Sequence, residues 1–127
     1  MAYLIVSDLH LCDVENNIDG WKNYKNEKFK IDNDFKNLLD KYKNQEITLI
    51  LNGDIIDFDL IDDYPKDEVF KISRSEKKRG LDPTEEKSLW KLKKVMDNQK
   101  DFFKIIAEFL SKNNNKIIYI LGNHDRE

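Results

Sequence analysis

Short runs of hydrophobic residues that end abruptly at polar residues recur three times along the chain. They occupy residues 2–6, 47–51 and 116–121. Each run is too short for a typical globular helix and is rich in isoleucine, leucine, valine and tyrosine, as is typical of buried strands. The second run stops at Asn52-Gly53, a pair that favours a sharp turn. We therefore predict three strands, and the unbroken first run is typical of a strand covered on both faces of its sheet.

Helical periodicity occurs in both intervals between these strands. Apolar residues recur three or four positions apart from about Asp32 to Lys43, with acidic residues first and lysines last, as the helix dipole favours. A second apolar stripe runs from Leu89 to about Lys112 and predicts one long helix, or two joined near Asn98. The segment Asp82-Pro83-Thr84-Glu85 predicts its start, with the aspartate as N-cap and the glutamate closing a capping box. Three asparagines, residues 113–115, end the stripe.

Strands that alternate with helices favour a parallel sheet joined by crossover helices. The 127 residues suffice for one small domain with a modest core. No internal repeat and no linker divides the chain. The sequence therefore predicts the α/β class, with a mostly parallel sheet in a single domain over residues 1–127.

Composition and charge indicate the cellular compartment and the classes of partner to expect. Acidic and basic residues nearly balance, with a net charge of −3, so no strong basic field points to nucleic acid. Cys12 is the only cysteine, which is compatible with a reduced protein in the cytoplasm. The amino terminus lacks the pattern of a signal peptide, and no apolar run approaches the ~20 residues needed to cross a bilayer. We expect a cytoplasmic protein without a membrane partner.

Each predicted strand is followed by side chains that can bind metal or carry protons. Asp8 and His10 follow the first strand, Asp54 and Asp57 the second, and the last is followed by residues 122–125, Gly-Asn-His-Asp. The carboxyl ends of parallel strands share one edge, where open α/β sheets place their ligand sites. In locally extended backbone, Asp8 and His10 would also point to the same side.

The residue types in this set suit hydrolysis of phosphate esters. Carboxylate, imidazole and amide oxygen favour manganese, iron or zinc over metals that prefer thiolate. A carboxylate on the middle strand, such as Asp54, can bridge two cations, which together activate water and neutralise charge on a phosphoryl group. His124 is a candidate to protonate the leaving oxygen, and Asp57 is a candidate to orient that imidazole.

Three sequence blocks carry a family resemblance. Residues 7–10 (Ser-Asp-Leu-His), 52–57 (Asn-Gly-Asp-Ile-Ile-Asp) and 121–125 (Leu-Gly-Asn-His-Asp) resemble, in order and in the strand before each, the first three signature blocks of the calcineurin-like metallophosphoesterases. The resemblance implies a two-metal phosphoesterase acting on phosphate mono- or diesters. It implies that Asp8 and His10 bind the first metal, that Asp54 bridges both and that Asn123 binds the second. It further implies that His124 acts near the leaving group, paired with Asp57.

The resemblance also implies that more of the domain belongs with these residues. Family members continue with further strands and histidine blocks, whereas His10 and His124 are the only histidines here. We therefore expect the amino-terminal part of an α/β sandwich, in which the metal site is incomplete because imidazole ligands are missing. We also expect apolar surface that favours self-association or binding of the remaining half. The alternative is a catalytically silent half-domain that binds metal or a partner. Phosphate monoesters, diesters, nucleotides, nucleic acids and lipid phosphates all stay open as substrates.

Two further segments have weaker signals. Residues 12–28 are polar and predict a loop over part of the site, and the aromatic residues Trp21, Tyr24 and Phe29 are better explained by packing than by contact with substrate. Residues 58–81 contain scattered carboxylates, Asp59 among them, and a basic run ending at Arg79. Their spacing does not match a calcium-binding loop, so a solvated loop is the better interpretation.

Overall fold

The computed structural model describes residues 1–13, 31–67 and 69–126 of the chain. The predicted loop over residues 12–28 and its aromatic residues fall almost entirely outside these ranges. All three predicted strands and both predicted helical regions fall within them.

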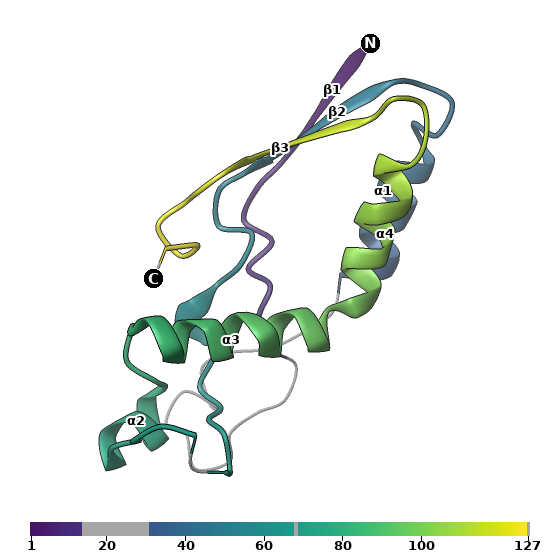
Figure 1. The fold of residues 1–127 in the computed structure, drawn as a ribbon. Helices are drawn as coiled ribbons and strands as arrows, with labels where there is room; N and C mark the ends of the chain where they lie inside the picture. Colours follow the sequence, from purple (N-terminus) through teal and green to yellow (C-terminus); the bar gives the residue numbers. More distant parts are fainter. Residues whose placement is uncertain (14–30, 68, 127) are drawn as a thin grey trace.

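A three-stranded parallel sheet forms the centre of the fold (Figure 1). It consists of β1 (Ala2–Val6), β2 (Ile47–Asn52) and β3 (Lys116–Ile120), in the spatial order β1-β2-β3. The register places Leu4 beside Leu49 and Leu49 beside Ile117. Because the strands are parallel, all three end at the same edge. The α/β class predicted from the sequence is confirmed.

One face of the sheet builds the hydrophobic core against the helices. Its inward side chains include Leu49 and Leu51 of β2, which are both buried. They belong to one cluster with Phe35, Val95 and Phe102 from the helices. In Figure 1 the helices lie to one side of the three strands. The core therefore fixes the sheet from one side and leaves the strand ends free to carry polar groups.

The other face is open within the described part of the chain. Tyr3 and Ile5 of β1 are 62% and 61% exposed, and Ile118 and Ile120 of β3 are about half exposed. The register aligns Ile5, Ile50 and Ile118 in one row across this face. The prediction that the first strand is covered on both faces is therefore wrong for the described residues. An unbroken apolar run cannot distinguish a face that is covered from one that awaits a partner.

The helices follow the predicted intervals, with different ends. They are α1 (Asp32–Asp40), α3 (Glu85–Asn98) and α4 (Lys100–Leu110), so the second helical region is two helices, as one alternative predicted. The predicted N-cap Asp82 is wrong, because Thr84 caps α3 and accepts a hydrogen bond from the backbone N–H of Lys87. Asp82 instead forms an ion pair with Arg79.

Two short helices lie where a solvated loop was predicted. They are the 3-10 helix η2 (Phe58–Leu60) and α2 (Arg74–Arg79). A capping box between Ser73 and Glu76 begins α2, and this Ser-x-x-Glu spacing was a readable signal in the sequence. No helix in the described ranges is long and apolar enough to cross a membrane.

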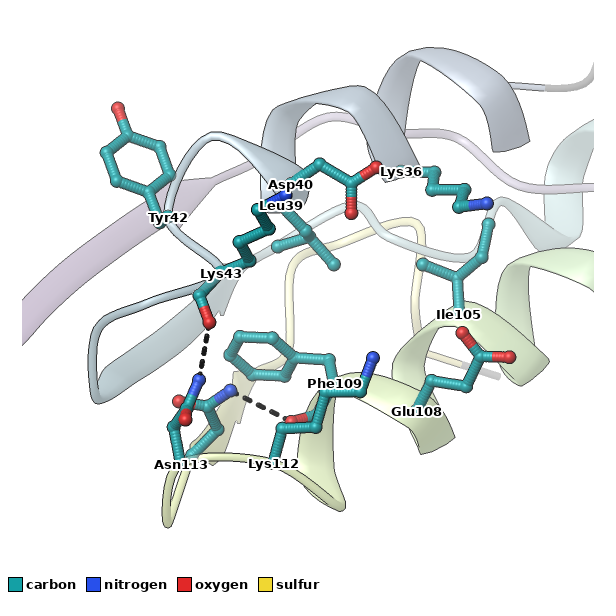
Figure 2. A pocket seen from close by; sticks show the side chains of 11 residues that line it. Lys36, Leu39, Asp40, Tyr42, Lys43, Ile105, Glu108, Phe109, Lys112 and Asn113 are labelled. Atoms are coloured by element: carbon teal, nitrogen blue, oxygen red, sulfur yellow. Dashed lines mark hydrogen bonds between the residues drawn. The ribbon is translucent and has the colours of Figure 1, made fainter.

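A small hollow marks the contact between α1 and α4 at the amino ends of the strands (Figure 2). The side-chain amide of Asn113 donates to the carbonyl oxygen of Lys43 at 2.7 Å, and that of Asn115 donates to the carbonyl oxygen of Phe109 at 2.9 Å. Asn115 also accepts from the backbone N–H of Ile47 at 2.8 Å. These contacts tie the helices to the start of β2, at the opposite end of the sheet from the candidate site.

Candidate metal centre

The backbone turns sharply where the first two strands end. Asp8, His10 and Asp54 all have left-handed conformations, with φ of 56°, 48° and 52°. The extended backbone predicted for Asp8 and His10 is therefore wrong. Left-handed conformations are uncommon for residues other than glycine, and they concentrate at functional sites where surrounding contacts hold them.

Hydrogen bonds between the two loops hold this conformation. The backbone N–H of Asp8 donates to the carbonyl oxygen of Gly53 at 3.1 Å, and that of His10 donates to the carbonyl oxygen of Asp54 at 2.9 Å. Leu11 then forms a parallel bridge with Ile56. Pairing thus continues past the ends of β1 and β2 and keeps their polar side chains adjacent.

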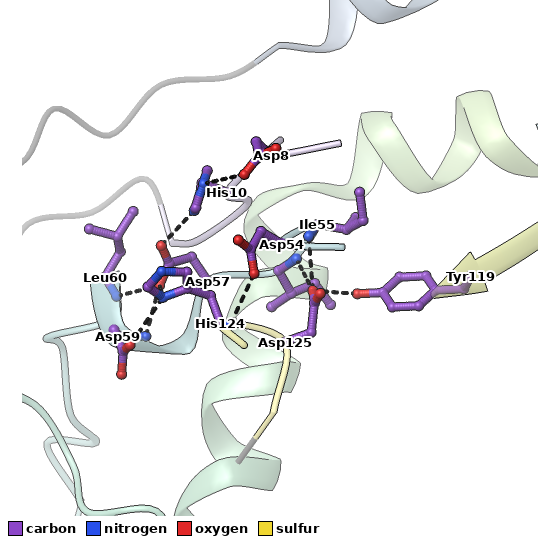
Figure 3. Close-up of polar contacts among 11 residues, drawn as sticks. Asp8, His10, Asp54, Ile55, Asp57, Asp59, Leu60, Tyr119, His124 and Asp125 are labelled. Atoms are coloured by element: carbon purple, nitrogen blue, oxygen red, sulfur yellow. Dashed lines mark hydrogen bonds and ion pairs between the residues drawn. The ribbon is translucent and has the colours of Figure 1, made fainter. Parts of the chain in front are cut away.

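His10 is held between two carboxylates (Figure 3). Its Nδ1–H donates to Oδ2 of Asp57 at 2.8 Å, since a carboxylate can only accept. Its Nε2 lies 3.6 Å from Oδ1 of Asp8. Donor atoms of Asp8, His10 and Asp54 all lie within 4.8 Å of one another. The structure thus brings together three of the four predicted metal ligands.

Asp8 and His10 have a spacing that fits one shared divalent ion. Ligand atoms about 2.0–2.2 Å from one ion are separated by about 3–4.4 Å, and the Nε2–Oδ1 distance of 3.6 Å falls in that range. A histidine that binds metal through one ring nitrogen usually donates the other N–H to a carboxylate. His10 has this arrangement, with Asp57 as its partner.

A second cluster surrounds His124. Its Nδ1 lies 3.1 Å from Oδ2 of Asp59 and 3.5 Å from Oδ1 of Asp57, and donor atoms of all three residues lie within 4.8 Å of one another. Burial alone would lower the pKa of His124. The negative charges of Asp57, Asp59 and Asp54 outweigh it and hold the pKa of the imidazole above its usual value. His124 therefore tends to keep its proton.

Asp59 is the residue that sequence analysis missed. The sequence placed Asp59 in a solvated loop. In the structure η2 begins directly after Asp57 and brings the carboxylate of Asp59 to His124. The two residues are 65 positions apart, so no local pattern could connect them. Asn123 is exposed and directly precedes His124, whose backbone N–H donates to Oδ1 of Asp54 at 3.0 Å.

Close packing of two glycine-containing turns brings the second and third loops together. Gly53 has a φ of 81°, and a methyl group added to it would meet the backbone of Gly122 at 3.4 Å. A methyl group on Gly122 would overlap the carboxylate and backbone nitrogen of Asp54. Only a glycine fits at residue 122 without displacing Asp54.

The comparison with protein families agrees with this geometry. The family model for calcineurin-like phosphoesterases matches residues 1–127. The chain belongs to the calcineurin-like phosphoesterase family. The predicted family is thereby confirmed, and candidate ligand groups for the divalent metals that such phosphoesterases use are present. Neither a search of curated proteins nor a search of solved structures found a significant match.

Proposed function

We propose that this calcineurin-like phosphoesterase binds two divalent metal ions at the carboxyl ends of its strands and hydrolyses phosphate mono- or diesters there. The observation that carries the proposal is the arrangement of His10. Its Nδ1 is tied to Asp57 while its Nε2 lies beside Asp8, as expected for a preorganised metal ligand.

The ligands divide into two groups. Asp8 and His10 would hold one ion and Asn123 the other, with Asp54 between them. Manganese, iron and zinc all match carboxylate, imidazole and amide donors. When bound, the ions supply positive charge that polarises the phosphoryl group and makes water a better nucleophile.

His124 is the proton donor of the proposed reaction. The carboxylates of Asp57 and Asp59 lie beside its Nδ1 and favour the protonated imidazole. Because Nδ1 faces the carboxylates of Asp57 and Asp59, Nε2 is the nitrogen left to protonate the leaving oxygen. Asp57 would orient both histidines, through one oxygen each.

Hydrolysis of an aryl phosphate mono- or diester with Mn²⁺, together with Mn²⁺ titration calorimetry, tests the proposal. We expect Asp54→Asn to abolish hydrolysis and to weaken Mn²⁺ binding. Asp97→Asn, which changes an exposed aspartate on α3, serves as the matched control and should behave as wild type. Equal activity of wild type and Asp54→Asn would refute the proposal. Mn²⁺ binding without hydrolysis would favour the silent metal-binding alternative.

A further inference from the structure

The carboxylate of Asp125 lies next to the metal centre and is held by several hydrogen bonds. It is only 8% exposed and accepts four hydrogen bonds. Oδ1 accepts from the backbone N–H groups of Ile55 and Ile56, at 2.9 and 2.7 Å. The same oxygen accepts from the hydroxyl of Tyr119 at 2.6 Å, and Oδ2 accepts from the backbone N–H of Gly122 at 2.7 Å.

The backbone donors come from two different loops, and the Tyr119 hydroxyl comes from β3. Ile55 and Ile56 directly follow Asp54 in the loop after β2, whereas Gly122 belongs to the loop after β3. The connection is reciprocal, because Oδ1 of Asp54 accepts from the backbone N–H of His124. Each loop thus donates backbone N–H groups to a carboxylate of the other (Figure 3).

This connection holds Asp54 in a conformation that the residue would not otherwise favour. Asp54 has a φ of 52°, and the two N–H groups fixed by Asp125 are those of the next two residues. A left-handed aspartate persists only when surrounding contacts determine its backbone. Fixing residues 55 and 56 therefore fixes the direction in which the Asp54 carboxylate points.

A carboxylate is needed because donors approach both of its oxygens. An asparagine at this position would offer one acceptor oxygen only. Its amide group would face a backbone N–H on the other side, donor against donor.

We propose that Asp125 is a positioning residue. Its carboxylate joins the loops after β2 and β3 by hydrogen bonds, and this holds Asp54 and His124 in place for metal binding and catalysis. The inference rests on the proposed function and deepens it. Asp125 itself does not have to touch metal or substrate, because it acts through the backbone of its neighbours.

Mn²⁺ calorimetry on Asp125→Asn, well below its unfolding temperature, tests the inference. We expect affinity to fall about 10- to 100-fold, as for other groups that orient metal ligands. Glu76→Gln is the matched control, because Glu76 is also buried and accepts backbone hydrogen bonds, but in α2. It should lower the unfolding temperature and leave Mn²⁺ affinity unchanged. Tyr119→Phe, which removes one donor, should weaken Mn²⁺ binding less than Asp125→Asn.

Amide hydrogen exchange gives a second measurement that needs no metal. The N–H groups of Ile55 and Ile56 should exchange slowly in wild type and faster in Asp125→Asn. If that variant does not fold, the same comparison is made with Tyr119→Phe. Unchanged Mn²⁺ affinity and exchange in the folded variant would overturn the inference alone. Failure of wild type to bind Mn²⁺ would overturn the proposed function, and this inference with it.

Discussion

Asp57 and His10 are joined by a hydrogen bond of 2.8 Å although 47 positions separate them in the chain. The bond fixes the imidazole ring so that its Nε2 faces Asp8. Asp57 is itself fixed, because its other oxygen accepts the backbone N–H groups of Asp59 and Leu60 at the start of η2. The 3-10 helix therefore sets the orientation of a histidine on the neighbouring loop.

Replacing this carboxylate by an amide should disorder the proposed metal ligand. In Asp57→Asn the amide nitrogen would face either the N–H of His10 or the backbone donors of η2, and both contacts are unfavourable. We expect Mn²⁺ affinity to fall about 10- to 100-fold, measured by titration calorimetry. Asp97→Asn is the control for loss of one charge. Wild-type affinity in Asp57→Asn would show that His10 needs no partner.

The approach of Gly122 to Asp54 gives a steric test of the same centre. A methyl group in Gly122→Ala would displace the Asp54 backbone and carboxylate, so we expect loss of about 1–3 kcal/mol of stability together with weaker Mn²⁺ binding. Gly80→Ala is a matched control, since its methyl group would also meet backbone, that of Ile61. Denaturant unfolding should show both variants destabilised, whereas only Gly122→Ala should lose metal affinity. Equal affinities in the two variants would contradict the steric coupling.

The sequence was sufficient to predict the strands and the common edge on which Asp8, His10 and Asp54 meet. Hydrophobic runs that end in polar residues are a local signal, and the parallel order follows from the alternation with helices. The left-handed backbone at these residues was not predictable, because it depends on hydrogen bonds between loops that are distant in sequence. The side chains converge by a different local geometry from the one expected.

The acidic partners were harder to assign than the ligands. Asp57 was expected to orient His124, and the structure also joins it to His10. Asp59 was assigned to a solvated loop because η2 has no periodic pattern of its own. Such second contacts depend on how loops pack after the sheet has formed, which neither composition nor spacing encodes.

Glu76 should make stability depend on acidic pH. Burial alone would raise its pKa, but hydrogen bonds from the backbone of Asp82, from Lys87 and from the backbone of Ser73 lower it from 4.5 to about 2. A carboxyl group whose pKa is lower in the folded state stabilises the protein above pH 4.5, and this contribution is lost as pH falls towards 2. The shift corresponds to about 3 kcal/mol. Urea unfolding from pH 7 to pH 2 measures the free energy of unfolding of wild type and of Glu76→Gln. We expect the excess stability of wild type over the variant to disappear as pH falls from 4.5 towards 2. A difference in unfolding free energy that stays constant with pH would contradict the lowered pKa of Glu76.

The open face of the sheet should make the protein associate. Tyr3, Ile5, Ile118 and Ile120 expose apolar area on one side of the three strands, and contiguous patches of this kind mark interaction surfaces. We expect wild type to self-associate through this face, or to bind a partner that covers it. A lysine in Ile118→Lys should oppose burial of this face and shift the protein towards monomer in static light scattering. Leu89→Lys is the control, because Leu89 is similarly exposed but lies on α3. A wild-type protein that stays monomeric at high concentration and melts cooperatively would show that the face needs no partner.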